Sequence, residues 1–187
     1  MRWMSLIGAL TWAVLLSGCG TLKNVRSFSR EYQGPAVGER AQLRVSVREG
    51  MVRGVPGRDC LDWDQAGSGV IAITHGGFAD PKFTPLPMPA PSMPTQKFRS
   101  EGSYAEGEVY IPAGKPMTLH YLSPGYCFLS LTFDAEPNAS YETTFSRDEK
   151  YCWYHVLKIK EGEGGLTVAE KVKIRPPQCR TQATPNP

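Results

Sequence analysis

The segment CFLSLTFD, residues 127–134, alternates apolar and polar side chains with the cleanest period in the sequence. Cys, Leu, Leu and Phe occupy its odd-numbered positions, and Ser130, Thr132 and Asp134 face the other way. A period of two residues is typical of a β-strand with one buried face. This segment therefore predicts a strand in a sheet that has one face against a core.

The same alternation recurs along the chain. Leu43, Val45 and Val47 alternate with Arg44, Ser46 and Arg48. Further strands are expected at 69–74, around Val109 and Ile111, and at 117–122, 141–145, 151–160 and 166–174. Residues 146–160 could instead begin a helix at Ser146 or Asp148, but their aromatic and β-branched content favours a strand. Short strands separated by turns every eight to twelve residues are typical of an all-β sandwich or barrel, and we expect a single immunoglobulin-like or transthyretin-like β-sandwich at 41–180.

The N-terminus has the order of an export signal. Arg2 precedes an uncharged apolar run from Trp3 to Leu16, which is too short to span a bilayer but matches the apolar region of a signal peptide. The run ends Leu16-Ser17-Gly18-Cys19, which resembles the lipobox of bacterial lipoproteins. The resemblance implies that Cys19 carries acyl chains such as palmitate. Gly20, where an Asp would retain the protein in the inner membrane, implies an outer-membrane anchor facing the periplasm.

This organisation leaves one domain. Residues 1–18 form the signal helix, 19–40 a flexible tether, 41–180 the sandwich and 181–187 a disordered tail. Removal of the signal leaves 187 − 18 = 169 residues, which suits one domain and a tether. The formal net charge of +3 gives no reason to expect a nucleic-acid partner. We expect the membrane, through the lipid, and another envelope protein as partners.

Four cysteines remain when Cys19 is assigned to the anchor, and an even number in an exported chain indicates two disulfides. Three pairings are possible, and we favour Cys127 with Cys152. A hairpin folded near residues 138–140 would place these two at matching distances from the turn, within reach of a disulfide. Cys60 and Cys179 are then paired by elimination.

A proline-rich stretch at 81–94 holds six of the 16 prolines. Proline cannot donate to a sheet ladder and favours an extended path, so we expect an exposed arm outside the sheets. The stretch is either a long loop or a recognition arm with Phe83, Leu86, Met88 and Met93 as apolar contacts.

Catalytic and metal motifs are absent from the sequence. No nucleotide-binding glycine motif and no His-Glu-x-x-His motif occurs, and no cofactor is expected. His75 follows a strand, where loops carry function, and is the histidine with the strongest claim to a site. Asp62 and Asp64 lie in an acidic turn whose spacing departs from a calcium loop. A set of Ser68, His75 and an aspartate would be needed for a serine hydrolase, but the nucleophile motif is missing.

Two other histidines are assigned to the fold. His120 lies on the polar side of its strand and is expected at the surface, and His155 is expected to be partly buried and hydrogen-bonded.

The turns and strands between residues 104 and 175, with Pro112-Ala113-Gly114-Lys115 as one turn, resemble modules of small exported β-sandwich proteins. This resemblance implies the fold only. The prediction is a lipid-anchored envelope protein with a non-catalytic binding or structural role. The alternatives are an envelope hydrolase and an inhibitor or immunity-type lipoprotein.

Overall fold

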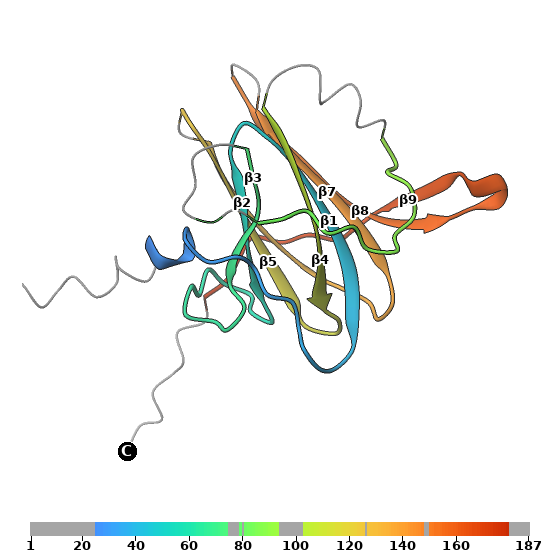
Figure 1. Cartoon of the computed structure of the whole chain (residues 1–187), viewed down its shortest axis with the longest axis horizontal. Coiled ribbons are helices and arrows are strands. Elements are labelled where there is room, and N and C mark those ends of the chain that lie inside the picture. Colours follow the sequence, from blue (N-terminus) through green and yellow to red (C-terminus); the bar gives the residue numbers. More distant parts are fainter. Residues whose placement is uncertain are drawn as a thin grey trace, which may run out of the picture.

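The chain folds into two β-sheets packed as a sandwich (Figure 1). The computed structural model describes residues 25–74, 79, 81–93, 103–125, 127–147 and 150–179. The signal at 1–18, Cys19, His75 and the tail at 181–187 lie outside the described residues. The prediction of an all-β sandwich is confirmed.

The four-stranded sheet has the order β3-β2-β5-β6, and the five-stranded sheet has the order β4-β1-β7-β8-β9. Neighbouring strands are antiparallel except β1 and β7, which run parallel. The strands are β1 (Arg40–Arg48), β2 (Met51–Pro56), β3 (Gly69–Ile73), β4 (Tyr104–Pro112), β5 (Pro116–Ser123), β6 (Cys127–Asp134), β7 (Ser140–Arg147), β8 (Cys152–Glu161) and β9 (Thr167–Lys171), with a 3-10 turn at Glu163–Gly165.

The alternating residues of β1 and β6 meet in the core between the sheets, as their pattern predicts. Leu43, Val45 and Val47 are completely buried. Aromatic rings from opposite sheets pack together. The ring centroids of Phe133 and Tyr141 lie 5.3 Å apart, and those of Tyr121 and Phe145 lie 5.4 Å apart. Burial of apolar side chains at about 1.5–3 kcal/mol each is the main force that holds the sheets together.

The strand β2 was not predicted from the sequence. Its Arg53, Gly54 and Pro56 are residues that weaken a strand signal. The structure explains Gly54, because a Cβ there would meet side-chain atoms of Met117 and Ile71 at 2.7 and 2.8 Å. The glycine therefore lets the core side chains approach the backbone closely.

The folded unit begins before residue 41, within the segment expected to be tether. The Tyr32 amide donates to the Val70 carbonyl at 2.9 Å, and the Val70 amide donates to the Arg30 carbonyl at 2.8 Å. Tyr32 is 7% exposed and belongs to the core. These contacts cover the edge of β3.

Residues 152–161 form the strand β8 and not a helix, as their aromatic and β-branched content favoured. Across the described part of the chain, no helix has the length and apolar character required to span a membrane.

Candidate functional site: an apolar row on the four-stranded sheet

Four apolar side chains form a row across the outer face of the four-stranded sheet. Ile73 of β3 pairs with Met51 of β2, Met51 pairs with Leu122 of β5, and Leu122 pairs with Phe128 of β6. These positions alternate with core residues such as Tyr121, so their side chains point away from the partner sheet. We call Ile73, Met51, Leu122 and Phe128 the apolar row.

The apolar row lines an open hollow of about 450 Å³. Phe128 is 59% exposed, which is unusual for a phenylalanine on a sheet face. Thr74, Ser103 and Ser123 add a few polar groups to the lining, and Pro124 extends the apolar part. A concave apolar surface with a few polar groups is the usual form of a binding site.

The turn between β1 and β2 shapes one side of the hollow. It consists of Glu49 and Gly50, which carry the chain from one sheet to the other. Gly50 has φ 152°, and a Cβ there would collide with the Leu122 carbonyl oxygen. Glu49 has φ 53°, a left-handed conformation that is uncommon for a residue with a side chain. The Thr74 amide donates to the Gly50 carbonyl at 2.9 Å, which fixes the turn against the end of β3.

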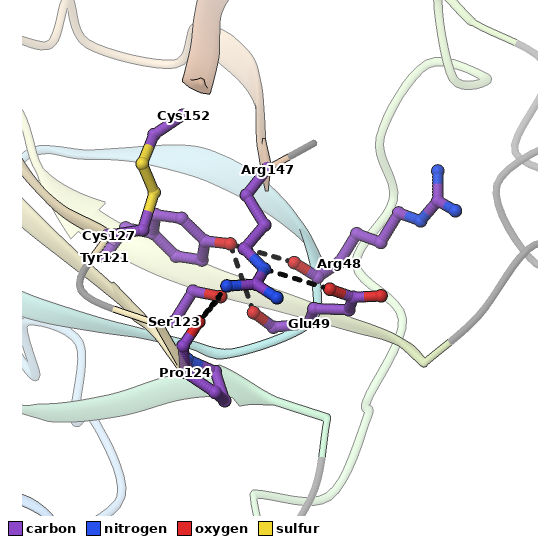
Figure 2. The surroundings of a disulfide bond; sticks show 8 residues. All are labelled: Arg48, Glu49, Tyr121, Ser123, Pro124, Cys127, Arg147 and Cys152. Carbon is purple, nitrogen blue, oxygen red and sulfur yellow. Dashed lines mark hydrogen bonds and ion pairs between the residues drawn. A yellow bond between two sulfur atoms is a disulfide. The ribbon is translucent and has the colours of Figure 1, made fainter. Parts of the chain in front are cut away.

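Hydrogen bonds connect both sides of the hollow to the five-stranded sheet (Figure 2). Arg147 of β7 reaches across to donate to the Glu49 carboxylate at 3.1 Å and to the Pro124 carbonyl. The Tyr121 hydroxyl donates to the Arg48 carbonyl at 2.9 Å, and burial raises the pKa of this phenol. These contacts fix the Glu49–Gly50 turn and Pro124 on the two sides of the hollow, so a ligand would meet a preformed surface.

A disulfide joins Cys127 and Cys152 beside this site, with their Cα atoms 6.1 Å apart (Figure 2). The pairing is as predicted, but the reason given for it is wrong. β6 and β7 belong to different sheets and do not form a hairpin. The bond therefore links the start of β6 to the start of β8 across the sandwich, and it anchors the strand that carries Phe128.

The next row of the same face is covered, not open. Arg53 is 1% exposed, and its guanidinium carbon lies 3.9 Å from the ring centroid of Phe28 and 3.9 Å from that of Trp63. Such stacking of a cation between two aromatic rings is favourable when water is excluded. Burial lowers the pKa of Arg53 to about 10.

His120 lies under the same cover. It is on the outward face, as expected, but the prediction that it is a surface residue is wrong, because Trp63 packs against its ring at 5.8 Å. Its Nδ1 is 2.7 Å from the Ser130 hydroxyl. Burial, together with the nearby charge of Arg53, lowers its pKa to about 4, so the ring is neutral at physiological pH.

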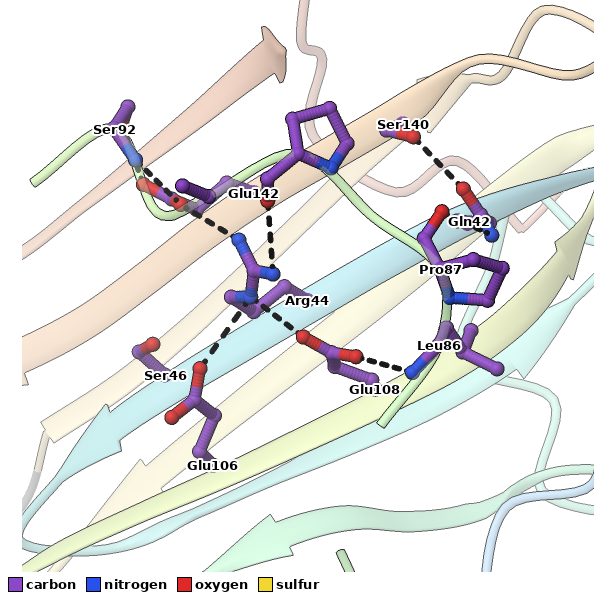
Figure 3. Close-up of polar contacts among 12 residues, drawn as sticks. Gln42, Arg44, Ser46, Leu86, Pro87, Ser92, Glu106, Glu108, Ser140 and Glu142 are labelled. Atoms are coloured by element: carbon purple, nitrogen blue, oxygen red, sulfur yellow. Dashed lines mark hydrogen bonds and ion pairs between the residues drawn. The ribbon is translucent and has the colours of Figure 1, made fainter. Parts of the chain in front are cut away.

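The proline-rich arm, described over 81–93, contains no strand but lies on the outer face of the five-stranded sheet (Figure 3). Its backbone bonds to side chains of a charged row. The Leu86 amide donates to Glu108 at 2.6 Å, the Ser92 amide donates to Glu142 at 3.1 Å, and Arg44 donates to the Pro89 carbonyl at 3.1 Å.

Glu108, Arg44 and Glu142 are cross-strand neighbours, and Glu106 joins them from the same face. Arg44 lies 2.7 Å from Glu108 and 3.4 Å from both Glu106 and Glu142. The four side chains are between 4% and 10% exposed. Of the apolar arm residues, Phe83 is half exposed and Met88 is partly buried.

The predicted acidic turn has a structural role, because its side chains stabilise the turn itself. The Asp62 side chain accepts a hydrogen bond from the Asp64 amide at 3.1 Å, as in an Asx turn, and lies 3.9 Å from Arg58. Asp64 is exposed. Asp62 and Asp64 are not brought together with any histidine among the described residues. In the same part of the chain, no cluster of three His, Cys, Asp or Glu side chains could hold a metal ion.

His155 is partly buried, and burial lowers its pKa. Its ring stacks beside Trp153 at 6.2 Å. The expected hydrogen bond is not found, because Nε2 is buried without a partner among the described residues.

The apolar row was not predicted from the sequence, although a signal was present. Phe128 and Leu122 occupy outward positions in strands whose other outward residues are polar. An apolar residue at such a position near the end of two adjacent strands predicts an exposed apolar patch. Met51 could not be included, because β2 itself was missed.

Comparison with known proteins adds no assignment: no protein-family model, curated protein or solved structure matches this chain.

Proposed function

We propose that this protein is a lipid-anchored, non-catalytic binding module of the cell envelope, and that it captures an apolar segment of another envelope protein in the hollow over the apolar row. The observation that carries the proposal is the open row itself. Among the described residues, Phe128 is exposed beside three other apolar side chains, whereas Arg53 in the next row of the same face is covered.

The shape of the hollow favours a polypeptide ligand. It is an open hollow whose lining comes from the strands β2, β3, β5 and β6 and from the segments that adjoin them. Phe128 lies at the β6 end of the apolar row, and a partner that buries its ring would gain the free energy of removing that apolar surface from water. Glu49 and Arg147 at the rim provide charge that can orient the partner.

Of the two residues expected for the enzyme alternative, Asp62 forms a turn and gives that alternative no support. His75 lies outside the described residues. An arm that is fixed to the sheet by its backbone, as here, supports the binding and inhibitor classes of function.

The anchor at Cys19 completes the proposal. The order of Arg2, the apolar run and Leu16-Ser17-Gly18-Cys19 supports lipidation. A lipid anchor would keep the module near the membrane and raise its effective concentration toward other envelope proteins.

The binding site is tested by photo-crosslinking in a bacterium with two membranes. A photo-reactive residue at Phe128 is expected to give a discrete crosslinked product, and the same residue at Val37, which is 86% exposed, serves as the control. Adding Leu122→Asp to the Phe128 variant should remove the product while the near-ultraviolet circular dichroism of the domain is retained. Identical products from both positions would show that the row is not the binding site.

The anchor is tested separately with radiolabelled palmitate. The wild type should incorporate label and remain with the outer membrane, and Cys19→Ala should do neither. Equal labelling of the two proteins would refute the anchor without affecting the binding site.

A further inference from the structure

Cys60 and Cys179 lie next to each other although 119 positions separate them in the sequence. The disulfide predicted between them is not formed in this structure, in which both are thiols, and Cys179 is near enough to raise the pKa of Cys60. The flanking backbone is joined as well, because the Gln178 amide donates to the Asp59 carbonyl at 2.7 Å. This bond between the residues that precede the two cysteines places the thiols near each other, as a disulfide requires.

The segment that carries Cys179 crosses from one sheet to the other. We call residues 172–179 the strap. It leaves β9, and Arg175 then pairs with Thr132 of β6 through two backbone hydrogen bonds of 2.8 and 2.9 Å. The strap thereby covers the outer edge of β6, which would otherwise present unpaired backbone groups.

Ion pairs of one arginine hold the strap in place. The Arg175 guanidinium makes a two-pronged contact with Asp134 at 2.7 and 3.0 Å and also contacts Asp59 at 2.9 Å. These hydrogen bonds raise the pKa of Arg175, so its charge is constant at any physiological pH. Asp59 is the residue before Cys60, and the same contact therefore aligns the two thiols.

We propose that Cys60 and Cys179 form an exchangeable disulfide that locks the strap over the edge of β6, and that oxidation enters through Cys179. Cys179 is exposed, whereas Cys60 is partly buried. The reactions required are two successive thiol–disulfide exchanges with a small disulfide such as oxidised glutathione or with a disulfide-carrying oxidoreductase.

The two steps balance without any other reagent. The Cys179 thiolate attacks one sulfur of the donor disulfide, forms a mixed disulfide and releases one donor thiolate. Cys60 then loses its proton to water, attacks the sulfur of Cys179 and releases the second donor thiolate. Two protein thiols are oxidised to one disulfide, and the donor disulfide is reduced to two thiols.

The environments of the two sulfurs set this order. Partial burial and the neighbouring Cys179 thiol raise the pKa of Cys60 to about 11, which makes it a poor first nucleophile. Once Cys179 is in the mixed disulfide, Cys60 is held beside the sulfur that it attacks, and this proximity compensates for its low thiolate population. Cys127 of the other pair is 3% exposed, so the two disulfides should differ in their access to reductants.

The order is tested with the full chain, purified from membranes in detergent and mapped by mass spectrometry after mild reduction. With oxidised glutathione, Cys60→Ser should accumulate a glutathione adduct on Cys179. Cys179→Ser should form an adduct on Cys60 at least about tenfold more slowly. The wild type should instead give a peptide that links Cys60 to Cys179.

Two results would overturn the proposal. An oxidised wild type without the Cys60–Cys179 link would refute the disulfide, and faster adduct formation on Cys60 would refute the order. Arg175→Met tests the alignment, and it should slow closure of the mixed disulfide by about threefold or more. Lys173→Met removes a neighbouring exposed charge and is the control, for which closure at the wild-type rate is expected. Equal slowing by both variants would refute the role of the Arg175 contacts.

Discussion

Replacement of Arg44 should destabilise the protein far more than replacement of any one of its acidic partners. Arg44→Met removes the guanidinium that lies 2.7 Å from Glu108 and 3.4 Å from Glu106 and Glu142, all of which are at least nine-tenths buried. Removal of one partner from a buried ion pair costs about 3–5 kcal/mol, because the remaining charge stays desolvated. The Pro89 carbonyl also loses its donor, so we expect a loss of at least about 4 kcal/mol in the free energy of unfolding.

Glu108→Gln should behave differently. Three carboxylates share Arg44 among the described residues, so loss of one negative charge leaves the guanidinium with two partners. Glutamine has a single acceptor oxygen, so it keeps the bond from the Leu86 amide and loses the bond from the Arg44 Nε. We expect a loss of about 1.5–3 kcal/mol, the usual value of one hydrogen bond to a charged group.

The comparison is made by urea unfolding followed by tryptophan fluorescence, with equal slopes required before midpoints are converted to free energies. Arg44→Lys keeps the positive charge but loses the planar set of guanidinium N–H donors. It provides an intermediate variant if Arg44→Met does not fold. The reasoning would be refuted if Glu108→Gln were as destabilising as Arg44→Met, or if Arg44→Met cost less than about 1 kcal/mol.

Three further predictions concern the acid limit, the turn and the disulfide. His120 has a folded pKa of about 4 against about 6.5 when unfolded, so its contribution is complete above pH 6.5 and is lost as the pH falls toward 4. Unfolding at pH 4.5 and 7 should show His120→Gln losing about 2 kcal/mol less than wild type over this range, and equal losses would contradict the assignment. Gly50→Ala should lower the free energy of unfolding by about 2 kcal/mol or more. Gly38→Ala, which has open space around its Cβ, is the control and should lower it by about 1 kcal/mol. Equal effects in thermal melts would argue against a collision at Gly50. Replacing both Cys127 and Cys152 by Ser opens a loop with a sequence separation of 25, which predicts a loss of about 3.5 kcal/mol in urea unfolding, and an unchanged midpoint would show that the bond is not formed.

The sandwich could be predicted from the sequence because period-two alternation reports which face of a strand is buried. The same pattern misjudged the other face of β1. Arg44 and Ser46 alternate with the core residues and face away from them, yet both are only 5% exposed. The proline arm covers Arg44, and the Ser46 hydroxyl lies 3.1 Å from the Tyr104 hydroxyl. Nothing in the local sequence at either place indicates that 81–93 and β1 meet, because the contact depends on backbone groups of the arm.

The disulfide shows a different limit. The pairing of Cys127 with Cys152 was predicted by counting residues from a presumed hairpin, and the pairing is confirmed. The true cause is that β6 and β8 begin at the same end of the two sheets. Sheet membership is a long-range property, and alternation within a strand carries no information about it.

The outer face of the four-stranded sheet is covered over some rows and open over the apolar row, and this difference supports the proposed role of the apolar row. Thr118, which pairs with Thr132, is completely buried and donates to the Arg58 carbonyl at 2.7 Å. Arg53 lies in the next row and is enclosed by aromatic rings. Phe28 of the N-terminal segment and the loop that carries Arg58 and Trp63 thus cover the rows that contain polar residues. Among the described residues, the row left open is the apolar one. Burial of apolar surface is favourable and burial of polar groups is not, so folding stability alone would favour the reverse arrangement. Exposed apolar surface held in a fixed shape by Gly50 and Arg147 is therefore the feature that supports the proposed binding site.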